Sequence, residues 1–394
     1  MTWKSTRLVD ITDLITKGTT PTTLGFDFAE HGIPFLRVQN IENGKVIYER
    51  GTLYIDRRTH EALKRSHIKA SDVLISIAGT IGRAALVPED APSLNCNQAV
   101  AIVRPTQEIF RPFLRFWLES PGAQRQMRAS VVTGTISNLS LTQLGNLQVP
   151  LPPLAEQRRI AEILERAEAL RFKRRAALAQ LDSLTQSFFL SLFGDPMKPS
   201  KRWRTATFGE FATHMAYGPR FYNEEYSSDG IRIIRITDLD DAGSLNFDVM
   251  PRMSVDASAE AKYSLQAGDV LFARSGSVGK SAVLPEDAPK CIAGAYFIVM
   301  RFAPEVRSTF ARSVINAPSV QKFIQVRSRQ AIQPNFSGPG VRALPLPLPP
   351  LELQCEFERQ VWAVEKLKAA QLASLTELNG LFASLQHRAF HGKL

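Results

Sequence analysis

Polar side chains in the first half of the chain gather beside glycines and at the end of a β-rich run. Gly18 would let the backbone approach a phosphate closely, and the β-rich run covers 33–38. Arginine pairs bidentately with guanine, and asparagine or glutamine with adenine, at base edges in the major groove. These side chains therefore predict a surface that reads nucleic-acid bases. The candidates are Lys17, Thr19, Thr20, Arg37, Gln39, Asn40, Thr133, Thr135 and Asn138.

The second half of the chain carries a comparable set of polar side chains around corresponding loops. Each residue has a structural alternative, because threonine or asparagine beside glycine commonly forms a turn. A surface arginine is usually just solvated. The set as a whole still predicts a second nucleic-acid surface. Its members are Tyr217, Arg220, Arg235, Thr237, Asp238, Arg274, Lys280, Arg329 and Gln333.

Catalytic and metal-binding patterns are missing from the sequence. His60-Glu61 is followed by Lys64 where a zinc-binding HExxH motif needs its second histidine. Gly279-Lys280-Ser281 resembles the end of a phosphate-binding P-loop, but Arg274 stands where that motif needs its first glycine. No Asn-Pro-Pro-Tyr motif for adenine methylation and no nuclease-type carboxylate cluster occurs. The three cysteines lack metal-ligand spacing. We expect a non-catalytic chain without a metal or cofactor of its own.

An internal repeat organises the chain. Asp72-Val73-Leu74 recurs as Asp269-Val270-Leu271, and Gly79-Thr80-Ile81-Gly82 as Gly276-Ser277-Val278-Gly279, each pair 197 residues apart. The same offset relates Leu151-Pro152-Pro153-Leu154 to Leu348-Pro349-Pro350-Leu351. One constant offset over such a length indicates two copies of one unit. The repeated Gly-x-x-Gly is better explained as a tight turn than as a ligand site.

Each copy begins with a globular part of mixed α/β character. β-rich runs at 33–38, 73–77 and 99–103 have counterparts at 231–236, 270–273 and 296–300. A single helix is predicted over 112–128, and its counterpart over 307–327.

Each globular part is followed by a long tail of helical character. No glycine or proline occurs from Ala155 to Phe193, and apolar residues recur at three- and four-residue steps. Such spacing favours a coiled coil, and the economical solution packs the two tails on each other. We therefore predict an α+β protein in which two homologous mixed α/β domains are separated by two long helices. The helices would form an antiparallel coiled coil with pseudo-two-fold symmetry. The predicted ranges are 1–150 and 196–347 for the domains, and 151–195 and 348–394 for the helices.

Charge and hydropathy narrow the class of protein. The net charge is +10, of which +4 falls in 1–150 and +5 in 196–347, so both globular parts could meet a polyanion. No apolar run approaches the ~20 residues that span a bilayer, and the N-terminus lacks a signal-peptide pattern. These features predict a cytoplasmic protein.

Several motifs resemble those of one family. Pro150-Leu151-Pro152-Pro153-Leu154-Ala155-Glu156-Gln157 before a long helix, with Gly134-Thr135-Ile136-Ser137-Asn138-Leu139-Ser140 upstream, is similar to the specificity subunits of type I restriction-modification systems. Gly32–Ile41 adds to the resemblance. The second copy departs from the pattern: Leu351-Glu352-Leu353-Gln354-Cys355 replaces Leu-Ala-Glu-Gln-Arg, and Pro219-Arg220 replaces Thr19-Thr20.

The resemblance implies a function for each part. Each globular part would be a target recognition domain for one half of a bipartite, asymmetric double-stranded DNA site, and the helical spacer would set the gap. The helices would dock two modification subunits, which methylate adenine with S-adenosylmethionine. Restriction subunits would add ATP-driven translocation and cleavage with magnesium. Residues that could serve docking are Arg158, Arg159, Glu162 and Arg166.

Two other classes of protein stay open at this point. A stand-alone nucleic-acid-modifying enzyme would need a catalytic cluster. A two-headed protein-interaction scaffold would need no affinity for DNA, whereas contacts to several phosphates would make DNA binding fall steeply with salt.

Overall fold

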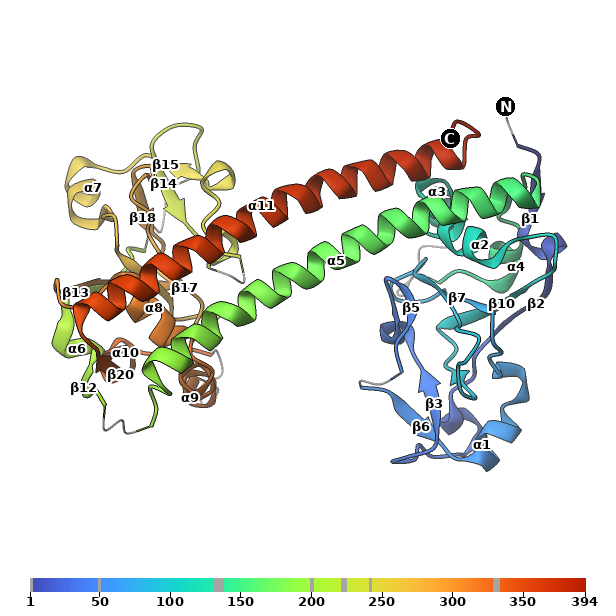
Figure 1. The fold of residues 1–394 in the computed structure, drawn as a ribbon, viewed down its shortest axis with the longest axis horizontal. Coiled ribbons are helices and arrows are strands. Elements are labelled where there is room, and N and C mark those ends of the chain that lie inside the picture. The colour runs from blue at the N-terminus through green and yellow to red at the C-terminus, as the bar shows by residue number, and fades with distance from the viewer. Residues whose placement is uncertain are drawn as a thin grey trace. The chain divides into compact units, whose positions relative to one another are not determined.

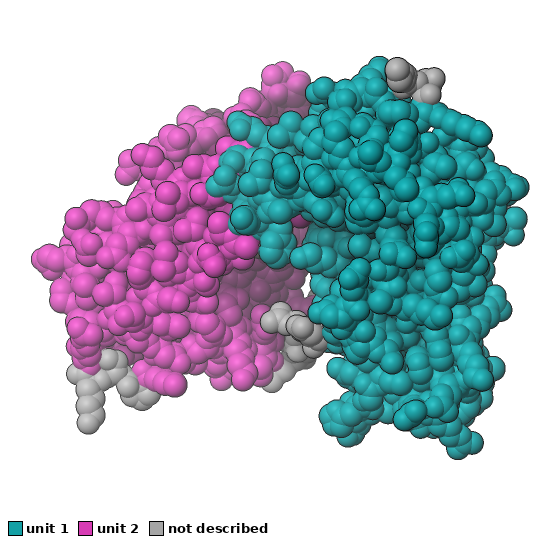
Figure 2. Space-filling view, turned by 45° about the vertical axis from the view of Figure 1, so that its right-hand side comes forward, with its two compact units in different colours: residues 1–174, 374–394 teal, residues 175–373 magenta. Residues whose placement is uncertain are grey.

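The computed structural model describes residues 3–48, 51–130, 138–198, 202–220, 225–240, 243–328 and 334–394. The chain divides into two compact units, coloured separately in Figure 2. Unit 1 combines Met1–Arg174 with Ser374–Leu394, and unit 2 is Arg175–Ala373. Each unit takes one stretch of each long helix, α5 (Leu154–Phe193) and α11 (Leu351–Ala389) (Figure 1). The segment boundaries predicted from the repeat fall at other positions and stay a prediction.

Unit 1 is built on a mixed sheet with strand order β2-β10-β7-β8-β5-β4. Its central strands β7 and β10 pair antiparallel and are almost wholly buried, because both faces are covered. A smaller sheet has the order β6-β3-β9, and β1 pairs with β11. The strands are β1 (Ser5–Arg7), β2 (Thr12–Lys17), β3 (Ile33–Leu36), β4 (Ile41–Glu42), β5 (Gly44–Val46), β6 (Leu53–Ile55), β7 (Val73–Ser76), β8 (Ala84–Leu86), β9 (Asn95–Cys96), β10 (Val100–Pro105) and β11 (Gln148–Pro150). The shorter helices are α1 (Arg57–Ala62), α2 (Arg111–Leu118), α3 (Pro121–Ser130) and α4 (Leu141–Gly145).

Unit 2 repeats this topology. The order β13-β19-β16-β17 matches β2-β10-β7-β8, β15-β14-β18 matches β6-β3-β9, and β12-β20 matches β1-β11. The α+β class and the homology of the two units are therefore confirmed. The strands are β12 (Arg204–Thr207), β13 (Ala212–Tyr217), β14 (Ile231–Ile234), β15 (Arg252–Met253), β16 (Val270–Ala273), β17 (Ser281–Val283), β18 (Cys291–Ala293), β19 (Phe297–Phe302) and β20 (Pro345–Leu348). The shorter helices are α6 (Phe208–Phe211), α7 (Ala257–Tyr263), α8 (Ser308–Asn316), α9 (Pro318–Ser328) and α10 (Gly338–Arg342).

The prediction of a single helix over 112–128 was wrong, and so was the prediction of its counterpart over 307–327. Each is two helices, α2 with α3 and α8 with α9, and the second begins at a proline. Proline has no N–H to donate and its ring obstructs the preceding turn, but it fits the first turn of a new helix. Pro121 and Pro318 stand 197 residues apart, so both copies break at the same point.

The repeated Asp-Val-Leu segment places a buried carboxylate directly before β7 and directly before β16. Asp72 accepts two bonds from Arg104, from Nε and Nη2, each 2.8 Å long. In unit 2, Arg301 makes the same pair with Asp269 at 2.7 and 2.8 Å. Both aspartates are at most 1% exposed, so a bidentate partner is needed to offset the desolvation of the charge.

The repeated Gly-x-x-Gly forms the tight turn between β7 and β8, and between β16 and β17. Gly79 and Gly82 have φ of 72° and 88°, and Gly276 and Gly279 have φ of 76° and 93°. These left-handed conformations are strained for residues with a Cβ. The prediction of a structural turn is confirmed.

The glutamine of the repeated Leu-Pro-Pro-Leu-x-x-Gln segment holds the start of each long helix. Gln157 is 1% exposed, and its Oε1 accepts a 2.7 Å bond from the Phe110 amide. Its Nε2 donates to the carbonyls of Pro152 at 2.9 Å and Glu108 at 3.2 Å. In unit 2 the same bonds, each 3.0 Å long, join Gln354 to Arg307 N, Pro349 O and Glu305 O. The motif therefore ties each long helix to the loop before α2 or α8.

We expect Gln157→Leu to lower the free energy of unfolding of unit 1 by about 1–3 kcal/mol. Leucine keeps most of the volume but leaves a buried N–H and two carbonyls without partners. Chemical denaturation of the full chain measures the loss. Gln180→Leu, at an exposed glutamine of the same helix, is the control, and equal stability of the two variants would contradict the role of Gln157.

The two long helices run antiparallel within unit 1. Arg159 Nη2 donates to the Leu394 carbonyl at 3.1 Å, and Arg171 Nε donates to Asn379 Oδ1 at 2.8 Å. Residue numbers therefore rise along α5 in the direction in which they fall along the C-terminal segment. The arginine side chain of Arg171 also lies over the Phe382 ring, 4.3 Å from its centroid.

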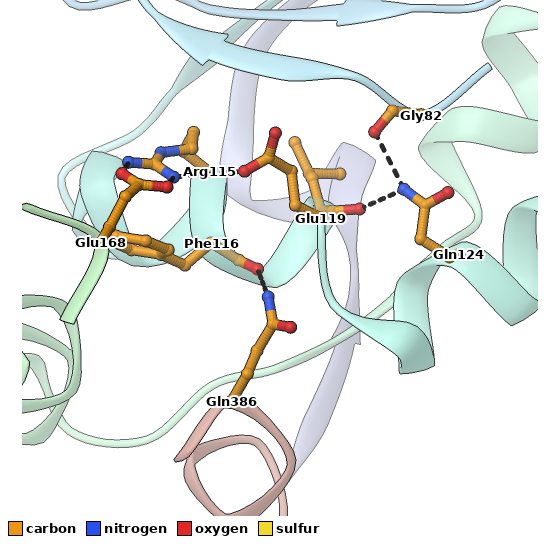
Figure 3. A network of polar contacts seen from close by, with 8 residues as sticks. Gly82, Arg115, Phe116, Glu119, Gln124, Glu168 and Gln386 are labelled. Atoms are coloured by element: carbon orange, nitrogen blue, oxygen red, sulfur yellow. Dashed lines mark hydrogen bonds and ion pairs between the residues drawn. The ribbon is translucent and has the colours of Figure 1, made fainter. Parts of the chain in front are cut away.

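Helix α2 joins both long helices in unit 1 (Figure 3). Arg115 is 7% exposed, and its Nη1 lies 2.9 Å from Glu168 Oε1 on α5. Its Nη2 also bonds Glu168, and its Nη1 lies 3.2 Å from Glu119 Oε2. Gln386 of α11 donates to the Phe116 carbonyl at 3.1 Å. Polar bonds therefore connect α2 to each of the two long helices.

The helices are also antiparallel in unit 2, where an aromatic cluster joins them. Lys368 Nζ lies 2.7 Å from Asp182 Oδ1. Phe357 of α11 packs against Phe189 and Phe193 of α5, with ring centroids 5.8 and 5.4 Å apart. Both α5 rings also contact Phe310 of α8. The tails were predicted to pair because of their apolar spacing, and the antiparallel direction that we hypothesised for them is present within each unit.

Two further observations concern the described part of the chain. It contains no helix long and apolar enough to cross a membrane. Within the same ranges, no three His, Cys, Asp or Glu side chains are grouped so that they could hold a metal ion.

Candidate nucleic-acid interface

The same backbone hydrogen bonds bring strand ends together in each unit. In unit 1, Gly18 N donates to Val100 O at 3.1 Å and Ile77 N to Ala99 O at 2.8 Å, while Leu139 N donates to Ile77 O at 2.8 Å. Unit 2 has equal bonds at the equivalent places, namely Gly218 N to Phe297 O, Arg274 N to Tyr296 O, and Phe336 N to Arg274 O. Side chains that project from this frame, which we call the strand-end frame, form the candidate interface.

Gly18 and Gly218 owe their identity to a close backbone crossing. A Cβ on Gly18 would lie 2.0 Å from the Cys96 carbonyl oxygen, and one on Gly218 would lie 2.2 Å from the Gly294 oxygen. No side chain fits at such a distance. Glycine is therefore needed at both positions for the backbone to cross. This packing constraint replaces the explanation inferred from the sequence, which was close approach to a phosphate.

The unit 1 candidates at the end of β2 are half-buried. Lys17, Thr19 and Thr20 all lie at the strand-end frame, and Thr19 N donates to the Cys96 carbonyl at 3.1 Å. The Thr20 hydroxyl donates to Oε1 of Gln98, an exposed residue in the loop between β9 and β10. We did not predict Gln98. Its position in the loop that Gly18 crosses could have been inferred only from the fold.

The next candidates in unit 1 form a 3₁₀ turn at Val38–Asn40. Asn40 is 1% exposed, and its Nδ2 donates to Ile47 O at 2.8 Å and Thr52 Oγ1 at 3.0 Å. Its Oδ1 accepts from the Arg37 amide at 2.8 Å. Both Nδ2 donors are used and the side chain is buried, so we reassign Asn40 from base contact to holding the turn. Gln39 stays exposed, and Arg37 Nη2 donates to Gly51 O at 3.0 Å.

The equivalent turn in unit 2, Ile236–Asp238, uses an ion pair. Asp238 is 4% exposed and accepts bonds from Arg235 Nε at 3.1 Å and Nη2 at 2.8 Å. Hydrogen bonds to this carboxylate raise the pKa of Arg235. Asp238 is therefore also reassigned to holding the turn. The Arg235 guanidinium uses Nε and Nη2 to bind Asp238. Thr237, like Gln39, is exposed.

A second group in unit 2 lies where β13 and β16 end. Tyr217 is 45% exposed, and the Arg274 guanidinium carbon lies 4.6 Å from its ring centroid. Arg274 Nε donates to Asn335 Oδ1 at 3.3 Å. Tyr296, 62% exposed, lies in the neighbouring loop and was not predicted. An exposed tyrosine gives no sequence signal until the fold places it beside Arg274.

The remaining candidates are more dispersed. Asn138 is exposed and forms a bridge with Ala78 at the strand-end frame of unit 1. Arg220 is exposed two residues after Gly218. Lys280 instead lines a cleft of about 790 Å³ in unit 2, together with Arg312 and Lys368. The candidates outside the described residues are Thr133, Thr135, Arg329 and Gln333.

The residues predicted for partner docking lie on the first turns of α5. Glu162 and Arg166 are exposed. Arg158 is exposed above the Phe110 ring, 4.8 Å from its centroid. Arg159 forms an ion pair within the chain, because its Nη2 lies 2.7 Å from Glu156 Oε1.

Exposed leucines recur at equivalent positions of α5 and α11. Each pair is 197 residues apart, and every member is 38–52% exposed although leucine is apolar. Scattered apolar side chains need no explanation, but repetition in both helices indicates two equivalent surfaces. The pairs are Leu154 with Leu351, Leu170 with Leu367, and Leu184 with Leu381.

Comparison with known proteins defines the class of this fold and site. Residues 1–180 match the family model described as the type I restriction modification DNA specificity domain. The specificity subunit of the type I restriction enzyme EcoBI from Escherichia coli is 33% identical over 183 residues, which are 45% of this chain and 38% of that protein. The EcoKI specificity subunit from E. coli K12 is 23% identical over 390 residues, covering 92% of this chain and 82% of that protein. The first part of the chain therefore matches the type I DNA specificity domain, and the chain as a whole is similar to type I restriction enzyme specificity subunits.

Solved structures share the fold. A chain from a study of complex assembly and conformational transition in the type I R-M system is 20% identical, with a TM-score of 0.58 over 100% of this chain and 98% of that chain. The type I S subunit from M. genitalium is 15% identical, with a TM-score of 0.58 over 99% of this chain and 96% of that chain. At this identity the similarity concerns the fold.

Proposed function

We propose that this chain selects a bipartite, asymmetric site in double-stranded DNA, with one half-site read by each unit. The observation that carries the proposal is the strand-end frame, which has the same backbone bonds in both units but different side chains. Lys17, Ile77 and Gln98 occupy it in unit 1 where Tyr217, Arg274 and Ala295 occupy it in unit 2. Equal frames with unequal side chains would read unequal half-sites.

The charge distribution supports contact with the DNA backbone. Each globular segment carries a net positive charge, +4 in 1–150 and +5 in 196–347, while 348–394 is neutral. Cations that neutralise phosphates release counterions, which supplies affinity independent of sequence. The exposed polar side chains would add the choice of bases.

The long helices would set the gap between the half-sites and would dock the catalytic partners. The repeated exposed leucines support two equivalent docking surfaces, as expected for two copies of one modification subunit. Arg158, Glu162 and Arg166 would add polar contacts. S-adenosylmethionine, ATP and magnesium would be used by the modification and restriction subunits, and this chain would choose the site.

Exchange of one recognition part tests the proposal. The wild-type chain with its modification subunit is expected to methylate adenines in one gapped sequence, which sequencing of methylated DNA would map. Replacing 1–150 with the matching segment of another family member should change one half-site and leave the other half-site and the gap unaltered. A donor with arginine at the position of Arg115 keeps the bond to Glu168.

Two results would contradict the proposal. A change in both half-sites would show that the units do not read separately. Absence of any sequence preference in the wild-type complex would remove the specificity function.

A further inference from the structure

Arg274 occupies a distinctive place in the strand-end frame. Its amide donates to Tyr296 O and its carbonyl accepts from Phe336 N, each at 2.8 Å, so its backbone is held on both sides. In unit 1 the same two bonds hold Ile77, whose side chain is 2% exposed in the core. One backbone position thus carries a buried aliphatic residue in one unit and a partly exposed cation in the other.

The Arg274 guanidinium is held by two further contacts. It lies over the Tyr217 ring, 4.6 Å from the centroid, and its Nε donates to Asn335 Oδ1 at 3.3 Å. Tyr217 is itself fixed, because its hydroxyl oxygen accepts a 3.0 Å bond from the Gly338 amide. A Cβ on Gly338 would lie 2.6 Å from that hydroxyl oxygen, so glycine makes room for the ring. The arginine is therefore positioned before any ligand binds.

These contacts leave the end of the guanidinium available. Within the described ranges, no hydrogen bond is made by Arg274 Nη1 or Nη2, whereas Arg235 gives Nη2 to Asp238 and Arg37 gives Nη2 to Gly51. The two terminal nitrogens form a planar pair of donors. Such a pair matches N7 and O6 of guanine in the major groove, and positioning in advance reduces the entropy lost on binding.

We propose that Arg274 determines specificity by reading a guanine in the half-site of unit 2. The inference rests on the proposed function and adds the base and the side chain that reads it. Unit 1 has no arginine at this position, because Ile77 stands there. Unit 1 would therefore not read a guanine from this position in the other half-site.

The test compares Arg274→Met with the wild type in the full chain bound to its modification subunit. The probe is a pool of DNA duplexes that keep the mapped first half-site and gap but carry a randomised second half-site. The wild type should select guanine at one position, and the variant should lose roughly ten- to hundred-fold of that preference. A second pool, which keeps the second half-site and randomises the first, should give the same first half-site for both proteins, which also shows that the variant is folded.

Two further variants sharpen the test. Lys290→Met removes one charge from the same unit at an exposed site that pairs with Glu260, at the other end of β18 from Tyr296, and should leave the guanine preference intact. Tyr217→Leu keeps the arginine but removes its ring support, so it should reduce the preference less than Arg274→Met does.

Three outcomes would overturn the assignment. A second half-site without a guanine excludes it. Uniform weakening across all sequences in Arg274→Met, with a shallower salt dependence, would mean that Arg274 contacts a phosphate. An equal loss in Lys290→Met would mean that charge alone matters. If the wild type selects no site, the proposed function is itself wrong, which is a different result from a normal site that Arg274→Met reads unchanged.

Discussion

Arg115→Ala is expected to lower the free energy of unfolding of unit 1 by about 3–5 kcal/mol, because it breaks a buried ion pair by removing one partner. Glu168 loses both bonds to the guanidinium, and Glu119 loses a 3.2 Å bond. Burial already raises the pKa of Glu119, against the attraction of Arg115. The loss of Arg115 would leave two carboxylates close together without a cation between them.

The same substitution also removes a packing contact. The Arg115 guanidinium lies over the Phe116 ring, 3.7 Å from the centroid, and Arg115 connects α2 to the part of α5 that belongs to unit 1. We expect the amides of α2 and of α5 before Arg174 to exchange faster with solvent deuterium. Amide exchange is the suitable measurement, since two units need not unfold in one transition.

Two controls define the result for Arg115. Arg57→Ala breaks an exposed ion pair with Glu61 within one helix, and such pairs contribute little to stability. Arg115→Met keeps a long side chain and should recover part of the loss through packing. If Arg115→Ala exchanged no faster than Arg57→Ala, the ion pair would not hold α2 to α5.

Phe357→Ala is expected to lower the free energy of unfolding of unit 2 by about 3–5 kcal/mol through loss of buried area and the cavity left behind. Phe357 is 0% exposed and joins α11 to Phe189 and Phe193 of α5. Since both those rings also contact Phe310, the cavity would loosen α8 as well. Faster amide exchange in α8 and in both helices of unit 2 would report the loss.

Trp362→Ala is the matched control for Phe357. Both residues are aromatic and lie on α11, but Trp362 is 64% exposed, so its removal should leave amide exchange in unit 2 almost unchanged. Phe357→Ala should also spare α2, because Phe357 and α2 belong to different units. Comparable destabilisation by both variants would show that the aromatic cluster does not hold the helices together.

Much of the fold could be predicted because its signals are local or periodic. The 197-residue offset indicated two copies, and the matching strand orders confirm it. Apolar residues at short regular steps predicted α5 and α11, and the absence of glycine and proline from 155–193 added to the prediction of α5. The helix breaks at Pro121 and Pro318 could also have been predicted locally, from the prolines themselves. The apolar pattern that continues on either side of each proline indicated one helix instead.

The interface was less predictable, because availability of a polar side chain depends on its neighbours. Arg235 and Arg274 have the same chemistry in sequence, but Asp238 occupies the end of one guanidinium and the Tyr217 ring supports the other. Asn40 was a reasonable candidate for adenine and is buried in a turn. Gln98 and Tyr296 belong to no sequence motif. They lie at the strand ends because they are in the loops that Gly18 and Gly218 cross.

The sequence by itself determined that the chain has two homologous globular parts and two long helices, since repeats and helical periodicity depend on residue order alone. Tertiary structure decided which of the candidate side chains are exposed and which are held by neighbours. Tyr217, Arg274 and Asn335 are separated by about sixty residues at each step of the chain, and meet because β13, β16 and the segment before α10 end at one frame. Hydrogen bonding and burial act over a few ångströms, so they are settled only when distant segments are packed together.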